Sequence, residues 1–248
     1  MSSATFYSNY DPFAQIYNES WGPDHIKTAL PYLEHLLLPH LPEEGHILDL
    51  CCGTGQLAQY LRKKGYQVTG VDSSEAMLTY ARQQASDSKF ILSDVRFLKL
   101  PSTFHAVVST SYGLNHVLDI DELISVFKNV YAALLENGLF VFDLSLQQRY
   151  QSSWNGSMLG DVKDDYAWAM VRNYDAEEQV GQINMTIFSK AEINWQRLDT
   201  TWLVKGYSIA EVQSALNDAG FEKVSVYNTE SELAPPDEAG IVYFVCRK

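Results

Sequence analysis

The segment that most constrains this chain is an apolar run that ends in a glycine loop and is followed by a helical pattern. Residues 47–55 read Ile-Leu-Asp-Leu-Cys-Cys-Gly-Thr-Gly. Such a segment is typical of a buried parallel strand that turns into a helix, where glycines let bare backbone approach a ligand. A second apolar run, 66–71, ends at Asp72, whose carboxylate can accept hydrogen bonds from both hydroxyls of a ribose. Together the two features predict a site for an adenosine-type cofactor.

Apolar runs alternate with helical patterns from Gly45 onward. Strands are expected near 46–51, 66–71, 89–92, 104–109 and 139–144, and helices near 56–64, 74–85 and 119–135. Gly65 and Gly138 stand where helices commonly end. Regular alternation indicates parallel strands with right-handed crossovers, hence a doubly wound, Rossmann-like α/β sheet. In such a sheet ligands bind at the carboxyl ends of the strands.

The alternation breaks over residues 151–206, which are rich in aromatic and β-branched side chains. Strands over 166–174, 179–189 and 197–206 with short connections predict an antiparallel β-meander inserted after the fifth strand. Ser208 and Glu211 form a capping-box pattern that opens a helix ending at Gly220. The runs 221–227 and 241–247 are expected to close a seven-stranded sheet as an antiparallel hairpin, with 230–240 as a surface loop.

About 45 residues of different character precede the first strand. Asp11-Pro12 is a typical helix start, and Phe13, Ile16 and Tyr17 then share one face. A second helix is expected over residues 24–38. We expect residues 1–44 to form a helical lid over the site, within a single domain that spans 1–248. The alternative is an aromatic helix that simply packs on the sheet.

Charge and composition narrow the partners and the location. The formal net charge of −13 would repel phosphate backbones, so a nucleic-acid substrate is disfavoured. No apolar run reaches membrane-spanning length, and the N-terminus has no pattern typical of secretion, so we expect a cytoplasmic protein without a membrane partner. Three cysteines are too few for a disulfide framework, and no His/Cys spacing indicates a metal site.

The stretch Asp49-Leu-Cys-Cys-Gly-Thr-Gly55 resembles the first motif of class I S-adenosylmethionine-dependent methyltransferases. In that family an acidic residue begins the motif and Gly-x-Gly closes it; Cys51 stands in place of the usual first glycine. The resemblance extends from about Gly45 to Lys248, and the whole pattern is similar to the branch that includes amino-sugar N-methyltransferases. It implies S-adenosyl-L-methionine as cofactor and methyl transfer to nitrogen or oxygen of a small molecule.

The resemblance also implies which residues contact the cofactor. Gly53 and Gly55 would allow the backbone to approach its methionine part, and Asp49 either organises this loop or reaches its amino group through water. In the family the acidic residue at the place of Asp94 accepts from the adenine amine, and the next backbone N–H meets the ring. The full candidate set is Asp49, Cys51, Gly53, Gly55, Asp72, Ser73, Met77, Asp94, Val95 and Ser109.

The segment 109–116 follows the fourth strand, where class I enzymes place cofactor and acceptor contacts. It lacks the Asn/Asp-Pro-Pro-Tyr typical of nucleic-acid amino-methyltransferases. His116 is the candidate for removing a proton, because the intrinsic pKa of histidine lies near neutral; alternatively it only orients the acceptor. The candidate acceptor-binding residues are Tyr10, Phe13, Tyr17, Trp21, Tyr112 and Asn115.

Two other functions fit part of this pattern. A nicotinamide-dependent oxidoreductase could use Gly53, Gly55, Ala58 and Asp72 as its fingerprint, although Asp49 and the long N-terminal segment disfavour it. A non-catalytic relative would bind the cofactor and regulate a partner. The β insertion is in addition a candidate interface for a homodimer.

Overall fold

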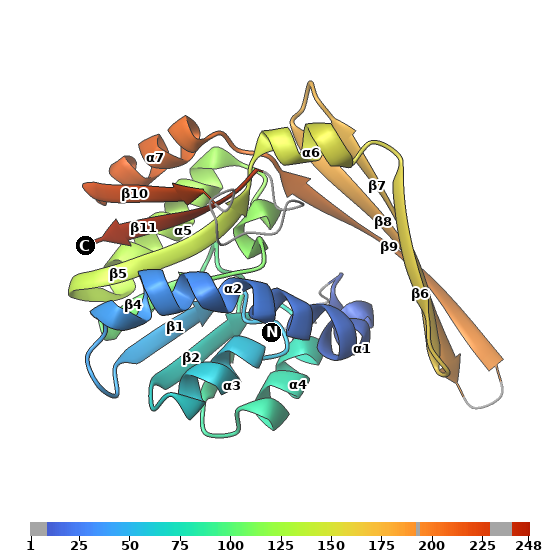
Figure 1. Ribbon diagram of the computed structural model, residues 1–248, viewed down its shortest axis with the longest axis horizontal. Helices are drawn as coiled ribbons and strands as arrows, with labels where there is room; N and C mark the ends of the chain where they lie inside the picture. Colours follow the sequence, from blue (N-terminus) through green and yellow to red (C-terminus); the bar gives the residue numbers. More distant parts are fainter. Residues whose placement is uncertain (1–8, 192–193, 229–239) are drawn as a thin grey trace, which may run out of the picture.

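The computed structural model describes residues 9–191, 194–228 and 240–248, and a seven-stranded sheet lies at its centre (Figure 1). The strands are β1 His46–Leu50, β2 Gln67–Asp72, β3 Lys89–Leu92, β4 Phe104–Ser109, β5 Leu134–Ser145, β10 Lys223–Asn228 and β11 Ile241–Arg247. Their order is β10-β11-β5-β4-β1-β2-β3. The first five strands pair in parallel, whereas β11 is antiparallel to both β5 and β10. The predicted Rossmann-like sheet and its terminal hairpin are confirmed.

Helices cover both faces of this sheet (Figure 1). They are α2 Gly22–Leu36, α3 Gln56–Lys63, α4 Glu75–Gln84, α5 Ile120–Ala133 and α7 Ile209–Asp218, whereas α6 Gln147–Ser153 lies beyond the end of β5 beside the second sheet (Figure 1). Successive residues of β5 point to opposite faces: Val141 packs in the cluster formed with α2 and α3, and Phe142 in the cluster formed with α5 and α7. The strand is therefore apolar on both sides, as a central parallel strand requires. No helix of the described residues is both long and apolar enough to cross a membrane.

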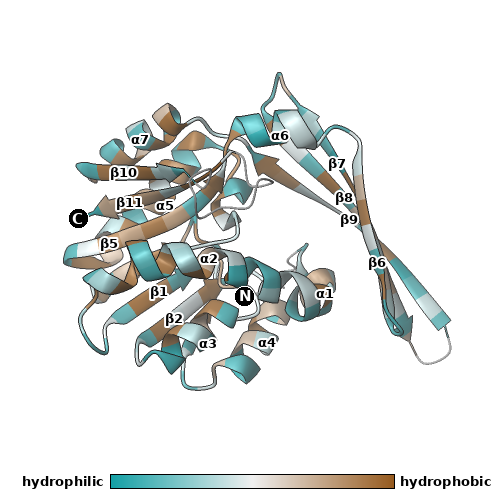
Figure 2. Ribbon diagram, in the orientation of Figure 1, coloured by the Kyte–Doolittle hydropathy of each residue, from teal (hydrophilic) through white to brown (hydrophobic). Residues whose placement is uncertain are grey.

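A second, four-stranded sheet follows β5 and α6. It consists of β6 Ser157–Val162, β7 Tyr166–Asp175, β8 Val180–Ala191 and β9 Asn194–Lys205, each antiparallel to its neighbour. Figure 1 shows it extending away from the central sheet, and Figure 2 shows brown and teal residues alternating along its strands. The predicted meander is confirmed, with β6 as an added edge strand.

The N-terminal segment forms one continuous helical path rather than two helices. A 3-10 turn, Asp11–Phe13, leads through α1, Ala14–Ile16, and a π-helical turn, Tyr17–Trp21, directly into α2. The Asp11 side chain does not cap the start of this helical segment. Its carboxylate instead accepts hydrogen bonds from the Ser74 hydroxyl and the Ala76 N–H. Asp11 therefore ties the segment to the start of α4.

Two expectations about element ends need correction. Gly138 does not end a helix, because α5 stops at Ala133 and β5 begins at once, so the glycine lies within the strand. The second N-terminal helix spans 22–36, not 24–38, and continues through Pro31. Helix α6 was not expected. Residues 1–8 of the expected lid, and nearly all of the expected 230–240 loop, lie outside the described residues.

Candidate active site

The glycine loop after β1 needs both of its glycines for packing. Gly53 and Gly55 have backbone φ angles of +53° and +86°, which residues with a side chain rarely adopt. A Cβ on Gly55 would lie 2.8 Å from the Ala81 Cα of α4, and a Cβ on Gly53 would lie 3.1 Å from the Tyr17 ring. The loop is therefore enclosed between α4 and the N-terminal segment. Cys51 adopts φ +55° in spite of its side chain.

Asp72 braces this loop from the end of β2. Its Oδ2 accepts the Gly53 N–H and its Oδ1 accepts the Ser74 N–H, both at 2.9 Å. Burial raises the pKa of Asp72, while these N–H groups act to lower it. The carboxylate that the sequence placed at the ribose lies at the expected edge, with Ser73 directly after it.

Asp49 is buried with an oxygen that lacks a partner. Its side chain is 1% exposed, and its Oδ2 accepts no hydrogen bond from the described residues. Burial, and then the charge of Asp72, hold its pKa well above the usual value. A small cavity of about 20 Å³ lies here, lined by Tyr17, Gly22, Ile26, Asp49, Cys51, Cys52, Gln56, Leu57, Thr110 and Ser111. A buried carboxylate in this state favours a ligand that brings a positive charge or a donor.

Asp94 lies after β3 and is already paired. The Arg96 guanidinium donates to it from Nη2 at 2.6 Å, and also reaches Glu122 of α5. Burial acts to raise the pKa of Asp94, but the Arg96 hydrogen bonds outweigh it and lower the pKa. Val95 is partly buried and packs against the core cluster that includes α5 residues. Any adenine contact would thus share the Asp94 carboxylate with Arg96, a residue the sequence did not single out.

The N-terminal aromatic side chains meet the β insertion. The ring of Tyr10 stacks on Trp202 of β9, with centroids 4.3 Å apart and an interplanar angle of 6°. The ring centroid of Phe13 lies 4.9 Å from that of Trp21 and 5.1 Å from that of Trp202. Tyr17 contacts Phe13 edge-on, and the buried Met77 of α4 joins the same cluster. The N-terminal candidates are therefore brought together, and Trp202 is an addition that only the folded insertion reveals.

His116, in the segment after β4, contacts both the N-terminal segment and β9. Its Nδ1 lies 3.0 Å from the Leu203 carbonyl of β9, which can only accept, so Nδ1 carries the proton. Its Nε2 then accepts from the Tyr10 hydroxyl at 2.7 Å. Burial lowers the pKa of His116 to about 4, despite the opposing hydrogen bond to Leu203. The imidazole is neutral at pH 7.

Asn115 holds the loop after β4 in place. Its side chain is fully buried, and its amide nitrogen donates to the carbonyls of Ser145 and Lys205. Its oxygen accepts the Ser145 N–H, so the amide is committed to the backbone. Ser109 is buried at the end of β4. Asn115 is not among the residues that line the cavities at this edge of the sheet.

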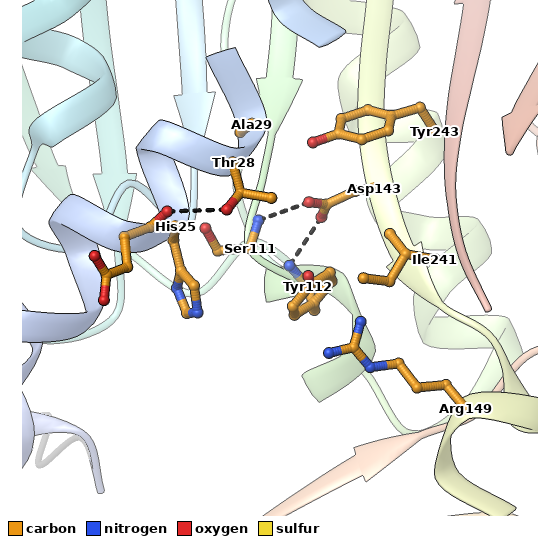
Figure 3. A pocket seen from close by; sticks show the side chains of 10 residues that line it. His25, Thr28, Ala29, Ser111, Tyr112, Asp143, Arg149, Ile241 and Tyr243 are labelled. Carbon is orange, nitrogen blue, oxygen red and sulfur yellow. Dashed lines mark hydrogen bonds between the residues drawn. The ribbon is translucent and has the colours of Figure 1, made fainter. Parts of the chain in front are cut away.

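A larger cavity of about 190 Å³ shares Ser111 with the small cavity at the glycine loop (Figure 3). It is lined by Asp24, His25, Thr28, Ala29, Ser111, Tyr112, Asp143, Arg149, Ile241 and Tyr243. Asp143 of β5 accepts the N–H groups of Ser111 and Tyr112 at 2.9 and 2.8 Å, which fixes the loop after β4. Asp143 was not among the sequence candidates, although its place near the carboxyl end of the fifth strand was a usable signal.

Known proteins share this architecture. A family model described as a methyltransferase domain matches residues 47–138. The putative methyltransferase YqeM of Bacillus subtilis (strain 168) is 27% identical over 245 residues, covering 96% of this chain and 97% of the relative. The dTDP-3-amino-3,4,6-trideoxy-alpha-D-glucopyranose N,N-dimethyltransferase of Streptomyces venezuelae is 31% identical over 102 residues, covering 41% of this chain and 43% of that one.

The whole fold has a counterpart among solved structures. The crystal structure of an S-adenosylmethionine-dependent methyltransferase from Clostridium acetobutylicum ATCC 824 superposes with a TM-score of 0.79 at 20% identity, covering 97% of this chain and 99% of that one. This likeness includes the central sheet and the strands that follow β5. Residues 47–138 thus match a methyltransferase domain, and the chain as a whole shares its fold with an S-adenosylmethionine-dependent methyltransferase.

Proposed function

We propose that the protein transfers the methyl group of S-adenosyl-L-methionine to a nitrogen or oxygen of a small molecule. The observation that carries the proposal is the enclosed glycine loop at the carboxyl edge of the sheet, flanked by Asp49 and Asp72 and continued by a 190 Å³ cavity. The relative that methylates an amino sugar, as its name states, supports a small acceptor.

The charge of the loop cavity fits this cofactor. S-adenosylmethionine carries a sulfonium and an ammonium, and the cavity lining contains Asp49 but no lysine or arginine. A positive group would neutralise Asp49 and give its Oδ2 a partner. The pyrophosphate of a nicotinamide dinucleotide is anionic, so the same lining disfavours the oxidoreductase alternative. The residues present therefore fit the sulfonium cofactor.

Each candidate has a place in this proposal. The backbone at Gly53 and Gly55, with Cys51 and Ser109 beside it, would hold the methionine part, and Asp72 with Ser73 the ribose. Asp94 and Val95 would border the adenine, and Met77, which packs in the same buried cluster as Phe13, would support that side. When bound, the cofactor supplies an activated methyl group, so the protein chiefly has to align the acceptor and exclude water.

His116 is the proposed proton acceptor. Its Nδ1–H is fixed by Leu203, so Nε2 offers the lone pair. The Tyr10 hydroxyl donates a hydrogen bond to that lone pair. Tyr10 therefore has to move aside, or its hydroxyl has to pass the acceptor's proton on to Nε2. The wall formed by Tyr10, Phe13, Tyr17, Trp21 and Tyr112 would close over the acceptor, while Asn115 acts by holding the loop. If the acceptor needs no base, His116 orients it instead.

The location and assembly are part of the same proposal. Cys51, Cys52 and Cys246 are free thiols, which supports a cytoplasmic protein. A homodimer through the insertion is supported by β6, where Met158 and Val162 are 64% and 76% exposed. The net charge of −13 supports a small molecule rather than a nucleic acid as acceptor.

Calorimetric titration tests the proposal directly. S-adenosylmethionine and S-adenosylhomocysteine should both bind the purified chain, and NAD should not bind comparably. Tighter binding of NAD would favour the oxidoreductase. Binding of the sulfonium cofactor without formation of S-adenosylhomocysteine across broad panels of amines, alcohols and carboxylates would favour the non-catalytic relative.

A further inference from the structure

The 190 Å³ cavity is far larger than the roughly 10–15 Å³ that one water needs. It shares Ser111 with the smaller cavity at the glycine loop, so the two are neighbours. Its walls come from α2, the loop after β4, β5, β11 and α6 (Figure 3). A small molecule in it would lie next to the cofactor loop.

Arg149 of α6 presents an unsatisfied cation to this cavity. Its Nη1 is buried without a hydrogen-bond partner, and no ion pair within the described ranges includes Arg149. The guanidinium lies over the Tyr112 ring at 5.2 Å, and a Cβ on Gly240 would come within 3.0 Å of the Arg149 Cβ. The side chain is therefore held on both sides, while a buried donor without a partner is costly.

His25 of α2 presents a second unsatisfied polar atom. Its Nδ1 is buried without a hydrogen-bond partner, and its ring lies 5.8 to 6.2 Å from the rings of Tyr17, Trp21 and Tyr112. Burial lowers the pKa of His25 to about 4, so it can donate only as a neutral ring. Figure 3 shows His25 and Arg149 on different walls, with Tyr112 between them.

The carboxylates at this cavity do not satisfy Arg149. Asp143 accepts two backbone N–H groups of the loop after β4, and Asp24 is exposed on α2. The group that lacks a partner is thus a donor and a cation, whereas the acids already have donors or solvent. Oxygen atoms with negative charge are the complement that Arg149 requires, because its planar fork matches them in pairs.

We propose that this cavity binds an anionic oxygen group of the methyl acceptor, a carboxylate or a phosphate, with Arg149 as charged donor and His25 Nδ1 as second contact. The inference rests on the proposed function and deepens it, since it names a chemical feature of the acceptor. The acceptor is then a small anionic molecule whose nucleophile faces the glycine loop while its charge is held at α6.

In the first test, acetate, inorganic phosphate or neutral acetamide is titrated into the protein saturated with S-adenosylhomocysteine. Changes in the amide chemical shifts report the binding of each molecule. Arg149→Gln should weaken the binding of the preferred anion at least tenfold. Arg197→Gln, an exposed arginine of β9 paired with Asp199, is the matched control and should change nothing. Tighter binding of acetate would identify the anionic group of the acceptor as a carboxylate, and tighter binding of phosphate would identify it as a phosphate. Anion binding that is equal in both variants, or matched by acetamide, overturns the inference.

A second measurement uses the wild-type protein, in case Arg149→Gln fails to fold. Phenylglyoxal modification of Arg149, read by peptide mass spectrometry, should be slowed by acetate or phosphate and not by acetamide. Absence of protection overturns the inference. Binding of S-adenosylhomocysteine in the same samples separates the two claims: if it binds and anions do not protect, only this inference fails, and if it does not bind, the proposed function fails.

Discussion

At the scale of single residues, the site depends on carboxylates that hold loops by their backbone N–H groups. Asp72 fixes the glycine loop and the start of α4, and Asp143 fixes the loop after β4. In the proposed function Asp72 also binds the ribose, so it is a structural group and a binding group at once. Its replacement should therefore change both affinity and stability, which distinguishes it from a carboxylate that only contacts a ligand.

The replacement Asp72→Ala tests this double role. It leaves the Gly53 and Ser74 N–H groups without acceptors, so the free energy of unfolding should fall by about 1–3 kcal/mol. Binding of S-adenosylmethionine should weaken at least tenfold, because the acceptor for the ribose is lost as well. Urea unfolding and calorimetry give the two quantities. Asp87→Ala, exposed in the loop before β3, is the control, and unchanged affinity in Asp72→Ala would place the ribose elsewhere.

The neutral His116 predicts a loss of stability in acid. Its pKa is about 4 in the folded protein and about 6.5 when unfolded, so the unfolded chain binds more protons between these values. The stabilisation is complete above about pH 6.5 and is lost as the pH falls toward 4. Urea unfolding at pH 7.0, 5.5 and 4.5 should show a shallower decline for His116→Gln than for wild type. The exposed His35→Gln should decline like wild type, and equal slopes for all three would contradict a neutral His116.

At the scale of elements, what the sequence predicts well is what local pattern determines. The capping box at Ser208 and Glu211 is a contact within one turn, and it forms as expected. Asp72, Gly53 and Gly55 could be placed because strand ends are visible as the ends of apolar runs. Alternation along β1 to β5 then fixes which edge they share.

What the sequence could not predict depends on contacts between distant segments. Strand β6 is exposed along most of its length, so it has no clear alternation, and it forms because β7 supplies its partner. Gly138 carries the usual signal of a helix end, yet β5 starts before it. Trp202 reaches the site only through the packing of the insertion on the N-terminal segment, and Arg149 only through the unexpected helix α6. No local pattern specifies that packing.

The contact between these two elements can be broken at Trp202. Its side chain is 4% exposed and stacks on Tyr10, so Trp202→Ala should lower the free energy of unfolding by about 3–5 kcal/mol. It should also release the N-terminal segment to limited proteolysis. Trp195→Ala is a matched control on the same strand, because Trp195 is 49% exposed. Equal losses of stability and equal cleavage in the two variants would show that the aromatic cluster does not hold the segment.

At the scale of the whole molecule, the chain has a net charge of −13, and some of its acidic side chains lie at the proposed cofactor site. Asp49 is buried and Asp72 is half-buried near it, and both have raised pKa values in the free protein, for which removal from water is the main cause. The fold thus keeps acidic groups where they are unfavourable when ionised. A cation bound there would relieve this strain, so affinity and protonation should be coupled.

The coupling predicts a pH dependence of cofactor binding with a definite sign. A bound cation lowers the raised pKa of Asp49, so binding releases a proton and should tighten as the pH rises from 5 to 7. Calorimetry of S-adenosylmethionine in two buffers of different ionisation enthalpy measures both the affinity and the proton released. Asp49→Asn should remove most of the dependence, whereas Asp87→Asn, which changes the net charge equally at an exposed site, should retain it. If the slope is the same in both variants, general charge explains it and the cationic groups do not meet Asp49. If the wild type shows no slope, Asp49 serves only to organise the loop, the alternative that its sequence position left open.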